Sequence, residues 1–197
     1  TIDLNMFKGA YRTMAQGIND MVAGHIAVKK KAMACVKAFG EGNFDAPLEK
    51  FPGKKAFIND TIEQVRTNLK TFIADMKHMS SEHGRGDIEV VIDANKFKGD
   101  YRVMAQGVND MVGQHIATKK KAIAVFKEFG EGNFDAPLEK FPGKKAFIND
   151  TIEQVRGNLK ALLADTSLLA EAAQDGRIQV RADATKHRGD FRKIVEG

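Results

Sequence analysis

The amino-acid sequence repeats at a fixed distance of 90 residues, and this repeat constrains the fold more than any other feature. Residues 1–70 align without a gap on residues 91–160, and 56 of these 70 positions are identical. Each period holds two units of about 45 residues, which we call the FPGKK type (letters 51–55) and the FKGDY type (letters 97–101). Such a chain consists of stacked copies of one supersecondary unit, not of one or two globular domains.

Apolar residues recur at alternating steps of three and four over long stretches, for example from Ile58 to Met79 and from Tyr101 to Phe129. This is the heptad spacing of helices that pack in narrow coiled-coil seams. We expect helices of roughly 27–30 residues, each ending at a glycine that adopts the left-handed conformation without steric cost. These helix-end glycines are Gly42, Gly86, Gly132 and Gly176.

Connectors of about 11–13 residues separate the predicted helices and are too long for the short loops of antiparallel pairs. Prolines at positions 47, 52, 137 and 142 favour an extended backbone there. Eleven extended residues reach roughly 36 Å, enough to return along the first helix, so the two helices of a unit should run parallel. Alternating apolar residues should bury against the helices as connector anchors: Phe44, Leu48, Ile88, Ile92, Phe134, Leu138 and Ile178.

Two parallel helices per unit leave each apolar seam half covered, and a second copy of the chain is the simplest way to cover it. The sequence therefore predicts an all-α fold, a parallel homodimer whose four-helix coiled-coil units stack end to end with extended connectors. No helix breaker separates Ile58 from Met79, so the second helix of one unit continues as the first helix of the next. The predicted units span 1–24, 22–69, 66–113, 112–159 and 156–197, the first and last being partial.

The predicted helix 101–129 carries two overlapping seams, and the change from one seam to the other breaks the heptad phase. The break falls between Met111 and Val112, where an FKGDY unit meets an FPGKK unit. A helix with two competing faces can hold two packings of similar energy, and a signal can bias that equilibrium. We expect the unit types to differ in helix rotation, with hand-over layers at Met21, Val22, His25, Met111, Val112, His115 and Thr118.

Composition and motifs exclude several other classes of protein. The 197 residues include 31 Lys+Arg, 26 Asp+Glu and 43% hydrophobic residues, a mixture typical of an ordered soluble chain. No apolar run reaches the roughly 18–20 residues of a membrane span. The single cysteine, Cys35, fits a reducing compartment and cannot supply a disulfide framework. No catalytic triad, metal-ligand cluster or phosphate loop is present, so we expect no enzyme and no cofactor.

Several features leave alternatives open. The lysine tracts 29–31 and 119–121 are read as solvated faces, with a nucleic-acid or anionic-surface binder as the rival reading. His25 and His115 are read as polar layers that fix register, with a pH response or metal binding as alternatives. Cys35 is read as a small buried hydrophobe, with a redox role as the alternative. The chain starts at Thr1 in mid-pattern, which suggests a fragment of a longer protein.

The order of a heptad helix, a Gly-x-apolar connector with a second apolar anchor four residues later, and another heptad helix resembles HAMP domains, the signal-relay modules of bacterial receptors. Repeated units with the sequences found at residues 132–138 and 99–102 resemble the poly-HAMP segment of methyl-accepting chemotaxis proteins. One departure is that many HAMP units open the second helix with Asp-Glu, where this chain has Gly53-Lys54-Lys55 or Gly99-Asp100-Tyr101.

The resemblance implies a relay between a sensory input module and a kinase-coupled output module of the same receptor chain, through alternating helix packings of the dimer. It also implies a cytoplasmic segment of a membrane-bound receptor, whose partners are its own second copy and these modules, without nucleic acid. A passive coiled-coil spacer and the same array in a sensor histidine kinase are the alternatives. A spacer would gain nothing from alternating unit types.

Overall fold

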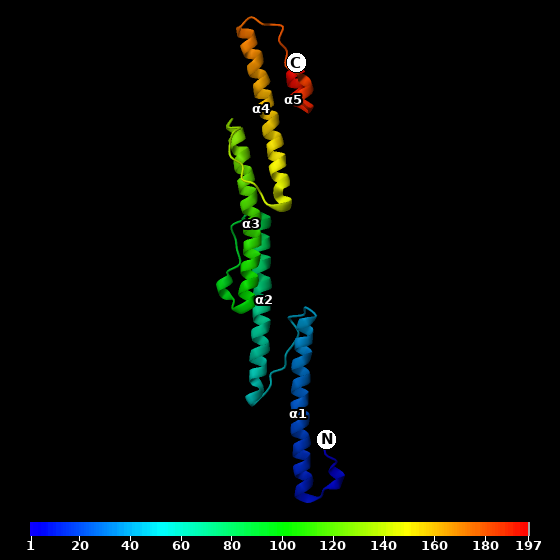
Figure 1. Cartoon of the computed structure of the whole chain (residues 1–197). Helices are drawn as coiled ribbons and strands as arrows, with labels where there is room; N and C mark the ends of the chain where they lie inside the picture. Colours follow the sequence, from blue (N-terminus) through cyan, green and yellow to red (C-terminus); the bar gives the residue numbers. More distant parts are fainter. Residues whose placement is uncertain (197) are drawn as a thin grey trace. The chain divides into compact units, whose positions relative to one another are not determined.

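The computed structural model describes residues 1–196, and these residues form helices and turns without any β-strand (Figure 1). This confirms the predicted all-α class. Short 3₁₀ helices precede the α-helices at Leu4–Met6, Gly53–Lys55, Ala94–Lys96, Gly143–Lys145 and Ala184–Lys186. The α-helices are α1 (Gly9–Gly40), α2 (Ala56–Arg85), α3 (Gly99–Gly130), α4 (Ala146–Gln174) and α5 (Gly189–Glu196).

The four long helices contain 29 to 32 residues, slightly more than the heptad pattern predicts. A glycine with positive φ closely follows each of them. For example, Gly86 has φ of 101° directly after α2, where an L side chain would be strained. The other three are Gly42, Gly132 and Gly176, with φ of 84°, 86° and 72°.

Four extended connectors join the helices, and we number them along the chain. The first connector comprises residues 42–54, the second 86–98, the third 132–144 and the fourth 176–188. The first and third belong to FPGKK units, and the second and fourth belong to FKGDY units. None of the helices in residues 1–196 is long and apolar enough to cross a membrane.

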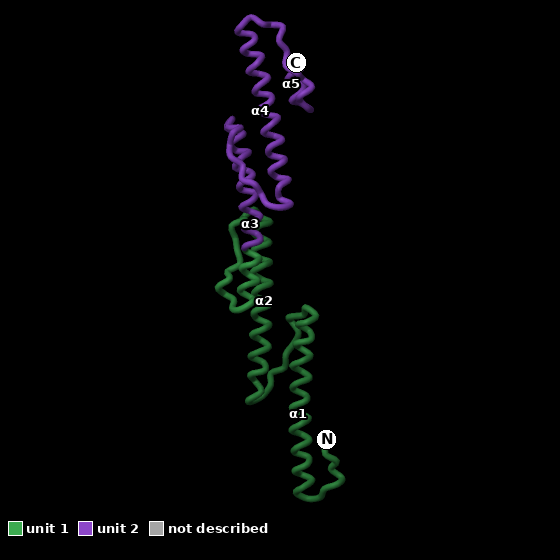
Figure 2. The backbone as a smooth tube through the Cα atoms, viewed as in Figure 1, with its two compact units in different colours: residues 1–109 green, residues 110–197 purple. Residues whose placement is uncertain are grey.

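The chain divides into two compact units, Thr1–Asn109 and Asp110–Gly197, with the division inside α3 (Figure 2). In the first unit, buried residues of α1, the first connector and α2 form one core, which includes Phe39, Phe51 and Ile62. In the second unit, Val125 and Phe129 of α3 form a core with Ile152 of α4. The boundaries predicted for the repeat units stay a prediction.

Helices α1 and α2 run parallel where they share the first connector. Lys31 of α1 pairs with Glu49, and the Glu49 carbonyl accepts a hydrogen bond of 2.7 Å from Asn59 Nδ2 of α2. Further along both helices, the guanidinium carbon of Arg66 lies 5.0 Å from the centre of the Phe39 ring. The contacts advance in the same direction along α1 and α2, which is the direction that the connector length predicts.

Large apolar side chains stay exposed along the helices of the single chain. Tyr11 on α1 is 71% exposed and Ile123 on α3 is 64% exposed. Exposed apolar side chains in heptad register are the surface that a second chain would cover. The parallel homodimer itself stays a prediction.

Candidate functional site: the connector clamps

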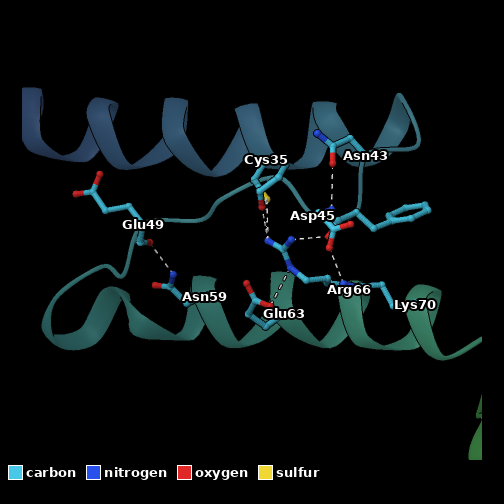
Figure 3. Close-up of polar contacts among 10 residues, drawn as sticks. Cys35, Asn43, Asp45, Glu49, Asn59, Glu63, Arg66 and Lys70 are labelled. Atoms are coloured by element: carbon cyan, nitrogen blue, oxygen red, sulfur yellow. Dashed lines mark hydrogen bonds and ion pairs between the residues drawn. The ribbon is translucent and has the colours of Figure 1, made fainter. Parts of the chain in front are cut away.

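The first connector is held by the side chain of Arg66, which reaches from α2 toward α1 (Figure 3). Its Nη1 donates to the carbonyl of Phe44 at 2.5 Å, and its Nη2 donates to the carbonyl of Ala46 at 2.7 Å. Its Nε forms an ion pair of 2.9 Å with Glu63 Oε2. Charge-assisted hydrogen bonds of this kind are stronger than neutral ones. Arg66 therefore fixes the backbone of the first connector to α2 at two residues, Phe44 and Ala46.

The third connector carries a similar clamp, made by Arg156 of α4 through one connector carbonyl. Nη1 of Arg156 donates to the carbonyl of Phe134 at 2.8 Å, and Nε pairs with Glu153 at 3.1 Å. The guanidinium carbon lies 5.2 Å from the centre of the Phe129 ring. The clamp thus recurs wherever the FPGKK unit recurs in the chain.

Asparagine side chains of the second helices form two hydrogen bonds each with the connector backbone, one as acceptor and one as donor. Asn59 accepts from the Phe51 N–H at 2.9 Å and donates to the Glu49 carbonyl at 2.7 Å. Asn109 accepts from the Ile92 N–H and donates to the Ile92 carbonyl, at 2.9 and 2.8 Å. The same pairing satisfies backbone groups that no strand or helix would satisfy. It also occurs at Asn149 in the third connector and at Asn19 near the amino end.

An exposed ion pair supports each Arg clamp. Lys70 of α2 donates to a carboxylate oxygen of Asp45 at 2.6 Å. This hydrogen bond, with the positive charges of Lys70 and the nearby Arg66, holds the pKa of Asp45 below its ordinary value of 3.8. Lys160 lowers the pKa of Asp135 in the same way. Because folding depresses these pKa values, the pairs stabilise the folded connector above pH 3.8 and lose that effect as the pH falls through the lowered pKa.

The second connector differs from the first in which helix binds its backbone. The side chain that bonds one of its carbonyl oxygens comes from the first helix of the unit. His83 of α2 bonds the Val90 carbonyl through Nε2 at 2.8 Å. Lys96 pairs with Asp75 of α2 at 3.0 Å, and the buried Phe97 ring meets Phe72 edge-on at 5.8 Å. In the first FPGKK unit, the corresponding carbonyl, that of Ala46, is bound by Arg66 of the second helix.

The fourth connector replaces the aromatic contact by a polar one. His187 occupies the position that Phe97 holds 90 residues earlier, and it is buried with 5% of its surface exposed. Its Nε2 lies 2.5 Å from Oδ2 of Asp165 on α4. Buried polar groups of this kind need a partner, and Asp165 supplies it. The two FKGDY connectors therefore share an attachment to the first helix but not the chemistry of that attachment.

The predicted connector anchors lie at very different depths in the single chain. Ile92 is 2% exposed, Ile88 is 39% exposed and Ile178 is 71% exposed. Four others are half-buried and pack on the cores of their units: Phe44, Leu48, Phe134 and Leu138. Their role as a set stays a prediction, since a second chain would change these exposures.

The predicted hand-over residues lie on uninterrupted helix. α3 continues through Met111 and Val112 without a break in its assignment. Val112 and Thr118 are half-buried, and Thr118 Oγ1 donates to the Gln114 carbonyl of the same helix at 2.9 Å. The others are exposed in the single chain: Met21, Val22, His25, Met111 and His115. Their role in a change of helix packing stays a prediction.

Pattern reading of the sequence missed the clamps, although one signal for them was present. An Asn-Asp pair follows an Ile or Val in the first half of each long helix, at residues 19–20, 59–60, 109–110 and 149–150. A polar pair that recurs in each long helix is a candidate for a repeated contact. Within residues 1–196, no group of three or more His, Cys, Asp or Glu is placed to hold a metal ion.

Comparison with known proteins gives two findings. Residues 28–70 and 118–160 each match the family described as HAMP N-terminal domain 3. Over 160 residues, the chain is 31% identical to the methyl-accepting chemotaxis protein McpB of Pseudomonas aeruginosa strain PAO1. The match covers 75% of this chain and 24% of that protein, so the chain spans about a quarter of the length of the relative.

Proposed function

We propose that this chain relays conformational signals inside a bacterial chemoreceptor, because residues 28–70 and 118–160 match the family described as HAMP N-terminal domain 3. It would connect a sensory input module to a kinase-coupled output module of the same polypeptide, on the cytoplasmic side of the membrane. Likeness to a methyl-accepting chemotaxis protein supports this assignment over the same array in a sensor kinase.

The observation that favours a relay over a passive spacer is the alternating attachment of the connectors. The Ala46 carbonyl is bound by Arg66 of the second helix, whereas the Val90 carbonyl is bound by His83 of the first helix. A spacer that only sets distance requires no such difference between successive units. A relay requires neighbouring elements that respond differently to the same movement.

The relay acts through a parallel dimer in this proposal. Each unit leaves apolar heptad residues uncovered, such as Met33 on α1 and Ile123 on α3, at 62% and 64% exposure. Covering them with the same residues of a second chain gives four helices per layer and a closed twofold assembly. Shifts of helix packing in one layer can then pass to the next through the continuous helices.

The test of this architecture is the mass of the chain in solution. Light scattering should give a mass near twice 21.7 kDa, and Ile123→Glu should shift the chain toward the monomer because it places charge in an apolar seam. Lys144→Glu, at an exposed site outside the seam, should leave the dimer unchanged. A wild-type monomer at micromolar concentration would reject the proposal.

A further inference from the structure

The first connector makes contacts of different kinds with its two helices. From α2 it receives directional hydrogen bonds, two from Arg66 and two from Asn59. From α1 it receives mainly apolar contact, as in the pair of rings Phe39 and Phe44 at 5.8 Å. Two backbone bonds close the end of α1, from the Gly42 and Asn43 N–H groups to the Phe39 and Ala38 carbonyls at 3.0 and 2.8 Å. Beyond them, the polar contacts shielded from solvent on that side are weak bonds of Cys35 Sγ, to the Ala46 carbonyl at 3.9 Å and from Arg66 Nη2 at 3.6 Å.

The second FPGKK unit repeats this asymmetry. Arg156 and Asn149 of α4 hold the third connector through hydrogen bonds of 2.7 to 2.9 Å. Val125 of α3 stands where α1 has Cys35, so the sulfur contact is absent there. The hydrogen bonds with α3 lie at the end of that helix, where Asn133 Nδ2 donates to Glu128 Oε2 at 2.8 Å and the Gly132 and Asn133 N–H groups bond the Phe129 and Glu128 carbonyls. Lys121 adds an ion pair with Glu139 at 2.5 Å, with both side chains more than half exposed.

The second connector, in contrast, is fastened by hydrogen bonds on both sides. His83 and Asp75 hold it to α2, and Asn109 holds it to α3. Thus α2 makes directional bonds to two connectors, the one before it and the one after it. On α4, the same double attachment is made by Arg156 toward the third connector and by Asp165 toward the fourth.

We propose that each FPGKK unit contains a slip plane between its first helix and a body formed by the second helix and the connector beyond its first two residues. Apolar contacts are non-directional and tolerate small displacements, whereas hydrogen bonds weaken steeply when their geometry changes. Movement of α1 therefore occurs against the first connector, while α2 carries the first and second connectors with it. The inference deepens the relay proposal by naming the surface at which the movement occurs.

The exposed ion pair across this plane does not prevent the movement. Lys31 and Glu49 have side chains that are 51% and 62% exposed. Exposed pairs are screened by water and contribute little to stability. The pair nevertheless provides a convenient place to tie α1 to the connector, because the two side chains already meet.

Paired cysteines in the full-length protein test the slip plane. One variant carries Lys31→Cys and Glu49→Cys, which join the first connector to α1. Its matched control carries Asp45→Cys and Lys70→Cys, which join the same connector to α2. Both carry Cys35→Val, the residue found at position 125. A short bis-maleimide closes each pair, and singly blocked protein serves as the uncrosslinked reference.

The readout is amide hydrogen exchange of residues 28–40, which reports local opening of α1. The 31–49 crosslink should slow this exchange by about tenfold or more, whereas the 45–70 crosslink should change it by less than about twofold. Equal slowing by both crosslinks, stronger slowing by the 45–70 crosslink, or no slowing by either would overturn the slip plane. The readout follows opening within one chain, so it stays interpretable if the mass measurement rejects the dimer.

Discussion

Ile92→Ala should destabilise the second connector by about 2–4 kcal/mol, because truncation of a fully buried aliphatic side chain leaves a cavity in its place. Ile92 is 2% exposed, and its own backbone N–H and carbonyl are both bound by Asn109. The hydrogen bonds alone cannot replace the lost apolar burial. The cost should appear as faster amide exchange of residues 86–98 and as earlier unfolding in denaturant.

The neighbouring residue offers a matched control for this prediction. Val91 is 60% exposed and faces away from Ile92 on the extended connector. Val91→Ala should therefore stay within about 0.5 kcal/mol of the wild type. If Ile92→Ala and Val91→Ala have equal effects, the connector does not pack through alternate residues.

Arg66→Met should cost about 2–3 kcal/mol of local stability, since it removes a charged donor from two carbonyl oxygens. Methionine keeps much of the apolar stem, so packing beside Phe39 is largely retained. The carbonyls of Phe44 and Ala46 would lose their partners. The measurement is the exchange of the Phe51 amide, whose own hydrogen bond to Asn59 reports closure of the clamp.

The control is Gln64→Met, an exposed site on the same helix, which should change the Phe51 exchange by no more than about 0.5 kcal/mol. The same substitution in the second copy, Arg156→Met, should loosen the third connector, where Phe134 supplies the carbonyl. An Arg66→Met protein with unchanged protection of the first connector would show that the asparagine bonds suffice without the guanidinium.

Local chemistry made the helices and their ends predictable from the sequence. Heptad spacing continues through all of α2, and the positive φ of Gly86 follows from the absence of a side chain at a helix end. Connector length also predicted the parallel direction of α1 and α2. These features depend on residues that are near one another in the chain.

The clamps depend on residues that only the folded chain brings together. Arg66 reaches Phe44 across 22 residues, and nothing in the spacing of either residue specifies that hydrogen bond. The burial of each connector anchor also could not be predicted from the alternation of apolar residues. Ile92 and Ile178 satisfy the same alternation but are 2% and 71% exposed, because exposure depends on the surrounding helices.

The central claim is that the two unit types hold their helices in different packings within a dimer. Spin labels at equivalent exposed positions of the two copies, placed layer by layer along each long helix, measure the distances that define helix phase. The relay account predicts that the pattern of distances in residues 22–69 recurs in residues 112–159 and differs in residues 66–113. Uniform distances through all of these units would contradict the relay and favour a passive spacer.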